Sequence, residues 1–223
     1  FIKAEFRDLI VRSVYAPFNG AGQPEHLTRR RAWDERLAQE LRGPDFVKAR
    51  VLMGDLNVVF EDKDMSDHPA FWKKQGDQGV DEKDRGFGGT TANERSRFKE
   101  MTGGCGLRDT FRPPLDPGEA RFTFRGEGKF LGKGLKLDYI MADEELVRAG
   151  GVDSSEVLTS MVNRDGFMGS DHAPLLCTLH PRWKQRRSNL LAHYEAWAPE
   201  EEKRTMEGMF KDTNAGQALP KVV

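Results

Sequence analysis

Apolar and polar residues alternate in several short stretches of the chain, a pattern typical of half-buried β-strands. In residues 8–16 the alternation stops before Pro17, so we expect a strand that ends at Tyr15. Residues 173–179 predict the last strand of the chain. Three more strands are expected, at residues 51–53, 121–125 and 135–141. The last two are separated by a glycine-rich connection and should be antiparallel neighbours.

Two other stretches predict helices. In residues 27–42 apolar side chains recur at helical spacing among many charges, and Gly43-Pro44 provides a stop signal. We expect this helix to pack on the sheet. A shorter helix should begin at the capping box formed by Thr91 and Glu94 and end near residues 103–104. Residues 61–90 show no clear period and are predicted to be one long loop.

The composition narrows the class of protein only a little. The chain has 223 residues, of which 37% are hydrophobic and 32% charged, and its net charge is −1. It can bury one substantial core, and no apolar stretch approaches the length of a membrane span. The charge argues against a generally basic nucleic-acid coat but leaves room for a local basic groove. Cys105 and Cys177 have no metal-site spacing, which favours a reduced intracellular protein, with a single disulfide as the alternative.

Four short polar motifs follow one another along the chain, each at the end of an apolar stretch. They are Tyr15-Ala-Pro17, Gly54-Asp55-Leu-Asn57, Leu137-Asp138-Tyr139 and Gly169-Ser-Asp171-His172. Taken singly, each has a structural explanation, because Gly, Asp and Asn are common turn residues and a lone Tyr usually packs. Four such elements in one order are improbable as separate accidents, so we interpret them as parts of one site.

The residue types in these motifs suit phosphodiester hydrolysis. That reaction needs a hard cation, a positioned water and a hydrogen-bond donor near the leaving oxygen. Asp carboxylates bind Mg²⁺ through oxygen. An Asn amide can donate to a phosphoryl oxygen, and a His held by an Asp can act as a charged donor. The sequence therefore predicts a metal-assisted phosphodiesterase site.

The motifs resemble those of the endonuclease/exonuclease/phosphatase superfamily, and within it the exonuclease III-like AP endonucleases. The resemblance covers roughly residues 8–180. Two further segments resemble that branch: Gly86-Phe87 through Glu94-Arg95, and Asp109-Thr-Phe111-Arg112. The resemblance implies an α/β (α+β) fold, a four-layer α/β/β/α sandwich of two mixed, mainly antiparallel sheets, incomplete at the N-terminus.

The resemblance also implies a role for each site residue. Asp55 looks like the acid that orients or deprotonates the attacking water, and Asn57 like the side chain that steadies the phosphate or that water. His172 resembles the phosphate-binding imidazole, with Asp138 fixing its tautomer. Tyr15 resembles a phosphate contact. The implied metal set is Asp171, Asp55, Asn57 and His172, holding Mg²⁺ or Mn²⁺.

Three departures from the family pattern concern the metal and the DNA. The early Asn and the metal-binding Glu of the family have no counterpart, because only fourteen residues precede Tyr15. Phe18 stands where many relatives have Asn, and Asn19 follows it. The amide that contacts the phosphate in those relatives is therefore displaced by one position or lost. Arg125 stands where relatives often have Trp. We expect Asn19, Arg125 and Lys136 to contact DNA.

Residues 1–181 are accordingly expected to be the C-terminal portion of such a domain within a longer protein. Residues 182–223, which begin with a basic cluster, should be a partly helical or disordered tail. The implied function is cleavage of double-stranded DNA at abasic sites in base-excision repair, with 3′–5′ exonuclease or 3′-phosphodiesterase action, by a monomer. It implies an intracellular location, nuclear in a eukaryote and otherwise cytoplasmic. Two alternatives stay open: another superfamily hydrolase acting on phosphoinositides, poly(A) or retroelement targets, or a truncated, non-catalytic DNA-binding remnant.

Overall fold

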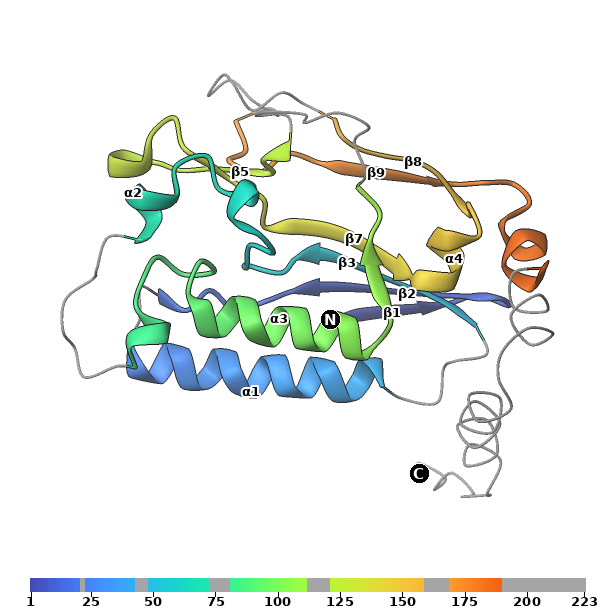
Figure 1. Ribbon diagram of the computed structural model, residues 1–223, viewed down its shortest axis with the longest axis horizontal. Helices are drawn as coiled ribbons and strands as arrows, with labels where there is room; N and C mark the ends of the chain where they lie inside the picture. The colour runs from blue at the N-terminus through green and yellow to red at the C-terminus, as the bar shows by residue number, and fades with distance from the viewer. Residues whose placement is uncertain (21–22, 43–47, 73–80, 112–120, 159–168, 190–223) are drawn as a thin grey trace.

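The computed structural model describes residues 1–20, 23–42, 48–72, 81–111, 121–158 and 169–189 (Figure 1). Its strands are β1 (Ile2–Glu5), β2 (Leu9–Tyr15), β3 (Ala49–Asp55), β4 (Leu107–Asp109), β5 (Phe124–Arg125), β6 (Gly134–Leu135), β7 (Asp138–Asp143), β8 (Val152–Val157) and β9 (Leu175–Leu179). Its α-helices are α1 (Pro24–Leu41), α2 (His68–Trp72), α3 (Ala92–Gly104) and α4 (Glu144–Arg148). Short 3₁₀ turns are η3 (Asp62–Asp64), η4 (Glu82–Asp84) and η6 (Gly128–Phe130).

A mixed five-stranded sheet forms the centre of the molecule, with the strand order β1-β2-β3-β7-β4. Strands β2 and β3 are parallel, and α1 connects them, whereas the other neighbours are antiparallel. Two small antiparallel sheets are formed by β5 with β6 and by β8 with β9. The predicted α/β class and the mixed, mainly antiparallel sheet are confirmed.

The central sheet is covered on both faces. Helices α1 and α3 lie together on one face, where Leu37 and Phe98 join a core with Leu52 and Tyr139 of the strands (Figure 1). On the other face, Val51 and Ala142 of the sheet pack with side chains from β8, β9 and the segment after β9. A helix layer, a five-stranded sheet and a two-stranded sheet therefore supply three layers of the expected sandwich.

Both predicted helices are present, and each has an identifiable start. Pro24 occupies the first turn of α1, where its missing N–H leaves no hydrogen bond unmade. Thr91 caps α3: its hydroxyl accepts the Glu94 amide at 3.3 Å and donates to the Glu94 carboxylate at 2.8 Å. The N-cap that the sequence indicated is thus formed, but the Glu94 carboxylate accepts the Thr91 hydroxyl and the Gly89 N–H, where a full capping box would have it accept the Thr91 backbone N–H.

The prediction of one long loop across residues 61–90 is wrong in its described parts. They contain η3, α2 and η4, and Phe71 of α2 is buried in a cluster with Phe87 and Phe130. These elements are three to five residues long, too short for a period to be visible in the sequence. Their stability comes from aromatic packing between segments that are far apart in the chain.

Several smaller expectations can be compared with the fold. Both cysteines are free thiols. Among the described helices, none is long and apolar enough to cross a membrane. The expected tail begins with a helical segment at residues 183–189, whose Trp183 packs on the core behind β9. The remainder of that tail, residues 190–223, lies outside the described residues.

Candidate active site

Three of the four motifs meet at one edge of the central sheet. Because β2 and β3 are parallel, both end there, and the antiparallel strand β7 begins there (Figure 1). The strand register places Tyr15 beside Asp55 and Asp55 directly opposite Asp138. Sheet pairing therefore brings these three motifs, which are far apart in the chain, close together in space. Because they lie at strand ends, their side chains are held rigidly.

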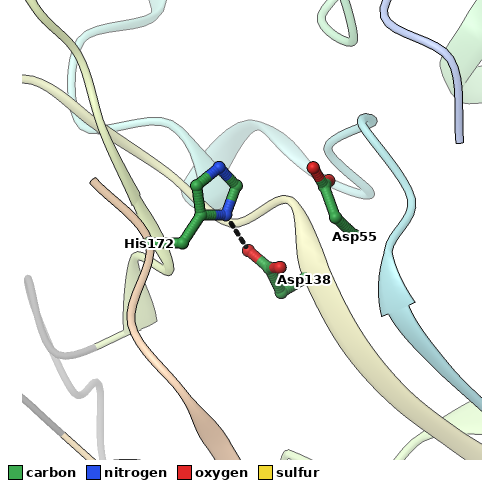
Figure 2. Close-up of side chains that lie close together, drawn as sticks. All are labelled: Asp55, Asp138 and His172. Atoms are coloured by element: carbon green, nitrogen blue, oxygen red, sulfur yellow. Dashed lines mark hydrogen bonds and ion pairs between the residues drawn. The ribbon is translucent and has the colours of Figure 1, made fainter. Parts of the chain in front are cut away.

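The fourth motif reaches this edge through the short strand β5. Phe124 of β5 forms a β-bridge with His172, and their rings lie 5.2 Å apart. The Nδ1 atom of His172 lies 2.8 Å from Oδ2 of Asp138, and Asp55 faces this pair from β3 (Figure 2). Ligand atoms of Asp55, Asp138 and His172 all lie within 4.8 Å of one another. The sheet edge thus gathers two carboxylates and one imidazole.

The turn after β3 fixes the carboxylate of Asp55. Gly54 has φ 127°, and a Cβ there would lie 2.0 Å from the carbonyl oxygen of Val14, so only glycine lets the strands approach this closely. Asn57 donates its backbone N–H to Oδ1 of Asp55 at 2.8 Å and its side-chain N–H to Oδ2 at 3.1 Å. The other side-chain hydrogen of Asn57 goes to the Ala16 carbonyl at 2.8 Å. Its amide oxygen, and not its amide N–H, is therefore the group that Asn57 can offer to a ligand.

The electrostatics of the site are those of two acids that repel each other beside one base. Burial, followed by the charge of Asp138, raises the pKa of Asp55 to about 6, although the backbone N–H of Asn57 opposes this. Burial alone would lower the pKa of His172. The hydrogen bond and charge of Asp138, with help from Asp55, outweigh burial and raise that pKa. The charge of Asp138 therefore stabilises the protonated form of the imidazole.

These donor groups fit a hard divalent cation. Mg²⁺ prefers oxygen ligands and is usually held by one or two carboxylates together with waters. The carboxylates of Asp55 and Asp138 face each other across paired strands, an arrangement that like charges disfavour unless a cation lies between them. Burial is the larger cause of the raised pKa of Asp55, and the facing charge of Asp138 adds to it.

The other residues expected at the site are differently placed. Tyr15 is 72% exposed beside Asp55, within reach of a ligand from solvent. Asp171 is exposed, does not belong to the cluster of ligand atoms, and accepts the Arg125 backbone N–H through its carbonyl at 2.9 Å. Arg125 is half-buried, and its guanidinium approaches the Gly132 carbonyl at 3.4 Å.

Two expected DNA contacts lack the exposure that such a role needs. Asn19 is fully buried, close to Gly88. Lys136 is 3% exposed, its ammonium is bonded to the Asp109 carboxylate, and it lies over the ring of Phe111 at 4.9 Å. The Lys136 ammonium is paired inside the protein, where an unpaired charge would be costly, and it is not available to DNA. The motif containing Asp109 therefore holds the segment just before Asp138 from the interior.

Sequence reasoning missed two side chains that hold the site. The Thr123 hydroxyl accepts the backbone N–H groups of Leu137 and Asp138, each at 3.0 Å. Arg30 of α1 is 2% exposed and bonds to the carbonyls that follow Tyr15 and Asp55. One signal was available: positions 30 and 34 fall on the same helical face as the buried leucines of α1.

Comparison with known proteins shows what the chain is similar to. No family model matches it. A DNA-(apurinic or apyrimidinic site) endonuclease of Arabidopsis thaliana is 31% identical over 200 residues, which are 86% of this chain and 54% of the relative. An exodeoxyribonuclease of Bacillus subtilis is 27% identical and is matched over 78% of this chain and 61% of its own length. The DNA repair nuclease APEX1 of Danio rerio is 30% identical over 78% of this chain and half of its own length.

Solved structures share the fold. A 3′ phosphatase from Neisseria, bound to a product DNA hairpin, has a TM-score of 0.62 and 21% identity over 80% of this chain and 63% of its own. An AP endonuclease from Archaeoglobus fulgidus has a TM-score of 0.60 and 23% identity, over 79% of this chain and 63% of its own. The chain spans about half the length of the curated relatives it matches. In sequence the chain is similar to AP endonucleases and an exodeoxyribonuclease, and it shares the fold of solved nucleases of this kind, which agrees with the resemblance of its motifs to the exonuclease III-like AP endonucleases.

Proposed function

We propose that this protein is a Mg²⁺-dependent nuclease that cleaves double-stranded DNA at abasic sites, with 3′-end processing as a second activity of the same site. The observation that carries the proposal is the convergence of Asp55, Asp138 and His172 from three distant segments onto one sheet edge. The names of the relatives, which are AP endonucleases and exonucleases, support the choice of DNA over other phosphodiesters. We further propose that the protein acts as a monomer, in the nucleus of a eukaryote or otherwise in the cytoplasm.

The metal would be held by the carboxylates of Asp55 and Asp138 together with the amide oxygen of Asn57. When bound, Mg²⁺, or Mn²⁺ in its place, supplies positive charge against the phosphate and the leaving oxygen. His172 would then donate a proton or bind the phosphate, because its Nδ1 atom is already bonded to Asp138. No nitrogen ligand is needed by a cation that prefers oxygen.

The side chains divide the remaining work by their charge state. Asp55, with a pKa near 6, is ionised at neutral pH and can accept a hydrogen bond or a proton from the attacking water. The Nε2–H of His172 is the donor that can face a phosphate oxygen, while Asp138 keeps the ring in place through Nδ1. Tyr15, exposed beside Asp55, can donate its hydroxyl to the phosphate.

The proposal is tested with the full-length protein and a duplex that contains one abasic site. Asp55→Ala and His172→Ala should each lower the rate of strand cleavage about 1,000-fold or more, as expected when a general base or charged donor is lost together with electrostatic stabilisation. The matched control is Asp153→Ala, which removes an exposed acid of β8 and should leave the rate unchanged. Near-normal cleavage by either site variant would refute the assignment.

Two further arms decide between this activity and the alternatives. Activity should disappear with a chelator and return with Mg²⁺ or Mn²⁺. A non-catalytic remnant would instead bind abasic DNA with salt-dependent affinity and show no turnover at any metal concentration. Phosphoinositide and poly(A) competitors distinguish the other superfamily branches, since a true AP endonuclease should prefer the abasic duplex over both.

A further inference from the structure

Helix α1 carries a buried ion pair on the face that packs against the sheet. The Nε atom of Arg30 lies 2.8 Å from Oδ1 of Asp34, and the side chains are 2% and 10% exposed. The other oxygen of Asp34 accepts Nε–H of Arg97 from α3 at 2.9 Å. Removing charges from water is expensive, so a buried pair by itself is weak evidence of a role in stability. The remaining donors of Arg30 are the informative ones.

Those donors bind main-chain carbonyls on both loops of the candidate active site. Nη1 donates to the carbonyl oxygens of Pro17 at 3.2 Å and Asn57 at 3.0 Å, and Nη2 donates to that of Leu56 at 2.8 Å. Pro17 belongs to the loop that follows Tyr15, and Leu56 and Asn57 belong to the turn that follows Asp55. One guanidinium of α1 therefore joins the two loops.

The same two loops are also joined directly to each other by hydrogen bonds. The carbonyl oxygen of Asp55 accepts the N–H of Ala16 at 2.8 Å, and Asn57 donates to the Ala16 carbonyl. Within the turn, Asn57 has φ 46°, a left-handed conformation that asparagine adopts more readily than other residues with a side chain. An external partner for the Asn57 carbonyl is one way to hold such a residue in place.

The Asn57 carbonyl has little space for any other donor. A Cβ on Gly89 would come within 2.5 Å of this oxygen, so the backbone of the neighbouring turn lies directly against it. The N–H of Val59 donates to the Gly89 carbonyl at 2.8 Å, which fixes that turn beside Asn57. The Arg30 guanidinium thus reaches a carbonyl that is otherwise enclosed by backbone.

We propose that Arg30 is a positioning residue of the nuclease site, acting through the backbone of Asn57 on the carboxylate of Asp55. The path is continuous: Arg30 binds the Asn57 carbonyl, and Asn57 binds both oxygens of the Asp55 carboxylate. This inference rests on the proposed function, because the catalytic importance of the Asp55 orientation is part of that proposal. The geometric part, that Arg30 orders the turn, is independent of it.

The planar fork of arginine is essential to this arrangement. A guanidinium presents donors in several fixed directions, whereas the ammonium of lysine is a single point on a flexible stem. Lysine at position 30 retains a positive charge near Asp34 but cannot reach Pro17, Leu56 and Asn57 together. Arg30→Lys therefore removes the positioning contacts with the smallest disturbance of charge.

The chain offers a matched control in Arg50, at the other end of β3. Arg50 is also buried and paired with a buried acid, Asp143, and it also binds two carbonyls, those of Leu41 and Cys105, at 2.7 Å each. Its acceptors belong to the ends of α1 and α3, away from the candidate site. Arg50→Lys should cause comparable structural loss without moving Asp55.

The experiment compares Arg30→Lys and Arg50→Lys in the full-length protein by cleavage kinetics and by hydrogen exchange. For Arg30→Lys we expect kcat to fall on the order of 10- to 100-fold, as small misplacements of a catalytic group do, while KM changes less than about threefold. Exchange at the backbone amides of residues 55–60 should be faster in this variant. For Arg50→Lys, kcat per folded molecule and exchange at residues 55–60 should match wild type.

Each outcome decides the inference. Equal loss of kcat in both variants, or normal kcat with unchanged exchange in Arg30→Lys, would overturn the positioning role. If wild type shows no nuclease activity at all, the proposed function fails, and the exchange data still decide whether Arg30 orders the turn. Unfolding of Arg30→Lys is monitored by its urea midpoint, and Arg30→Gln then provides a second, neutral variant for the exchange measurement.

Discussion

The two ends of the β3–β7 strand pair use charge in opposite ways. At the start of β3, Arg50 donates its backbone N–H and its guanidinium to the two oxygens of Asp143, at 2.6 and 2.9 Å, so every charge has a partner. At the end of β3, two like charges, Asp55 and Asp138, stand directly opposite each other. The same ladder therefore carries one end arranged for stability and one end that is electrostatically unfavourable without a ligand.

The difference separates an end of the strand pair that supports folding from an end that supports chemistry. A buried opposite-charge pair with complete hydrogen bonding holds α1, α3 and β7 together. A pair of facing carboxylates has no value for folding, since like charges across a ladder destabilise a sheet. Sites that break such local rules are expected to be functional, and the rest of the structure must stabilise them.

The largest effect on stability should follow from breaking the Arg50–Asp143 pair at the start of β3. In Arg50→Met the carboxylate of Asp143 stays buried without its partner, so we expect the free energy of unfolding to fall by about 3–5 kcal/mol. Urea denaturation measures it. Lys48→Met is the control: it removes a more exposed pair with Glu5 and should change the free energy by less than about 1 kcal/mol. Equal effects of the two variants would contradict the comparison.

A smaller effect should follow from removing one of the two facing charges, Asp55 and Asp138, by a substitution that keeps the shape of the side chain. Asp138→Asn removes the charge and the acceptor that hold Nδ1 of His172, so we expect kcat to fall about 100-fold and the pKa of His172 to drop. An NMR titration of the imidazole protons measures that pKa. Asp171→Asn is the control, because Asp171 contributes the weakest of the effects that raise the His172 pKa; an equal drop in both variants would refute the role given to Asp138.

The smallest effect concerns stability and pH. The Asp55 carboxyl has a pKa of about 6 in the folded protein, above its ordinary value of 3.8. The folded state therefore binds this proton more tightly, and its stabilising contribution is present below pH 3.8 and lost as the pH rises through about 6. Without metal, Asp55→Asn should gain about 1–2 kcal/mol over wild type between pH 4 and pH 8, after allowance for partial exposure. Urea midpoints at both pH values test this, and a pH-independent difference would contradict it.

The sequence located most of the site because its residues lie at strand ends, where the pattern changes. Asp55, Asp138 and His172 were found this way, and the structure brings their ligand atoms together. Helix α3 was predicted from local capping, which needs only residues three apart. Such a signal can be recognised in the sequence because it does not depend on distant partners.

What the sequence did not reveal depends on partners that are distant in the chain. Lys136 was expected to contact DNA, but its ammonium is bonded to Asp109 and lies over the ring of Phe111 in the interior. Strand β8 and helix α4 were not anticipated, since β8 exposes Asp153 and Glu156 and α4 has only five residues. Arg30 is hidden for the same reason: its acceptors are backbone carbonyls, which have no signature in the sequence.

The order in which the site residues occur along the chain has a consequence for synthesis. Asp55 comes early, Asp138 in the second half, and His172 only just before the final strand of the sheet pair. Non-local pairing of this kind must wait until all the segments exist. A nascent polypeptide on the ribosome can therefore build the helix-covered sheet before the imidazole of the candidate site has been synthesised.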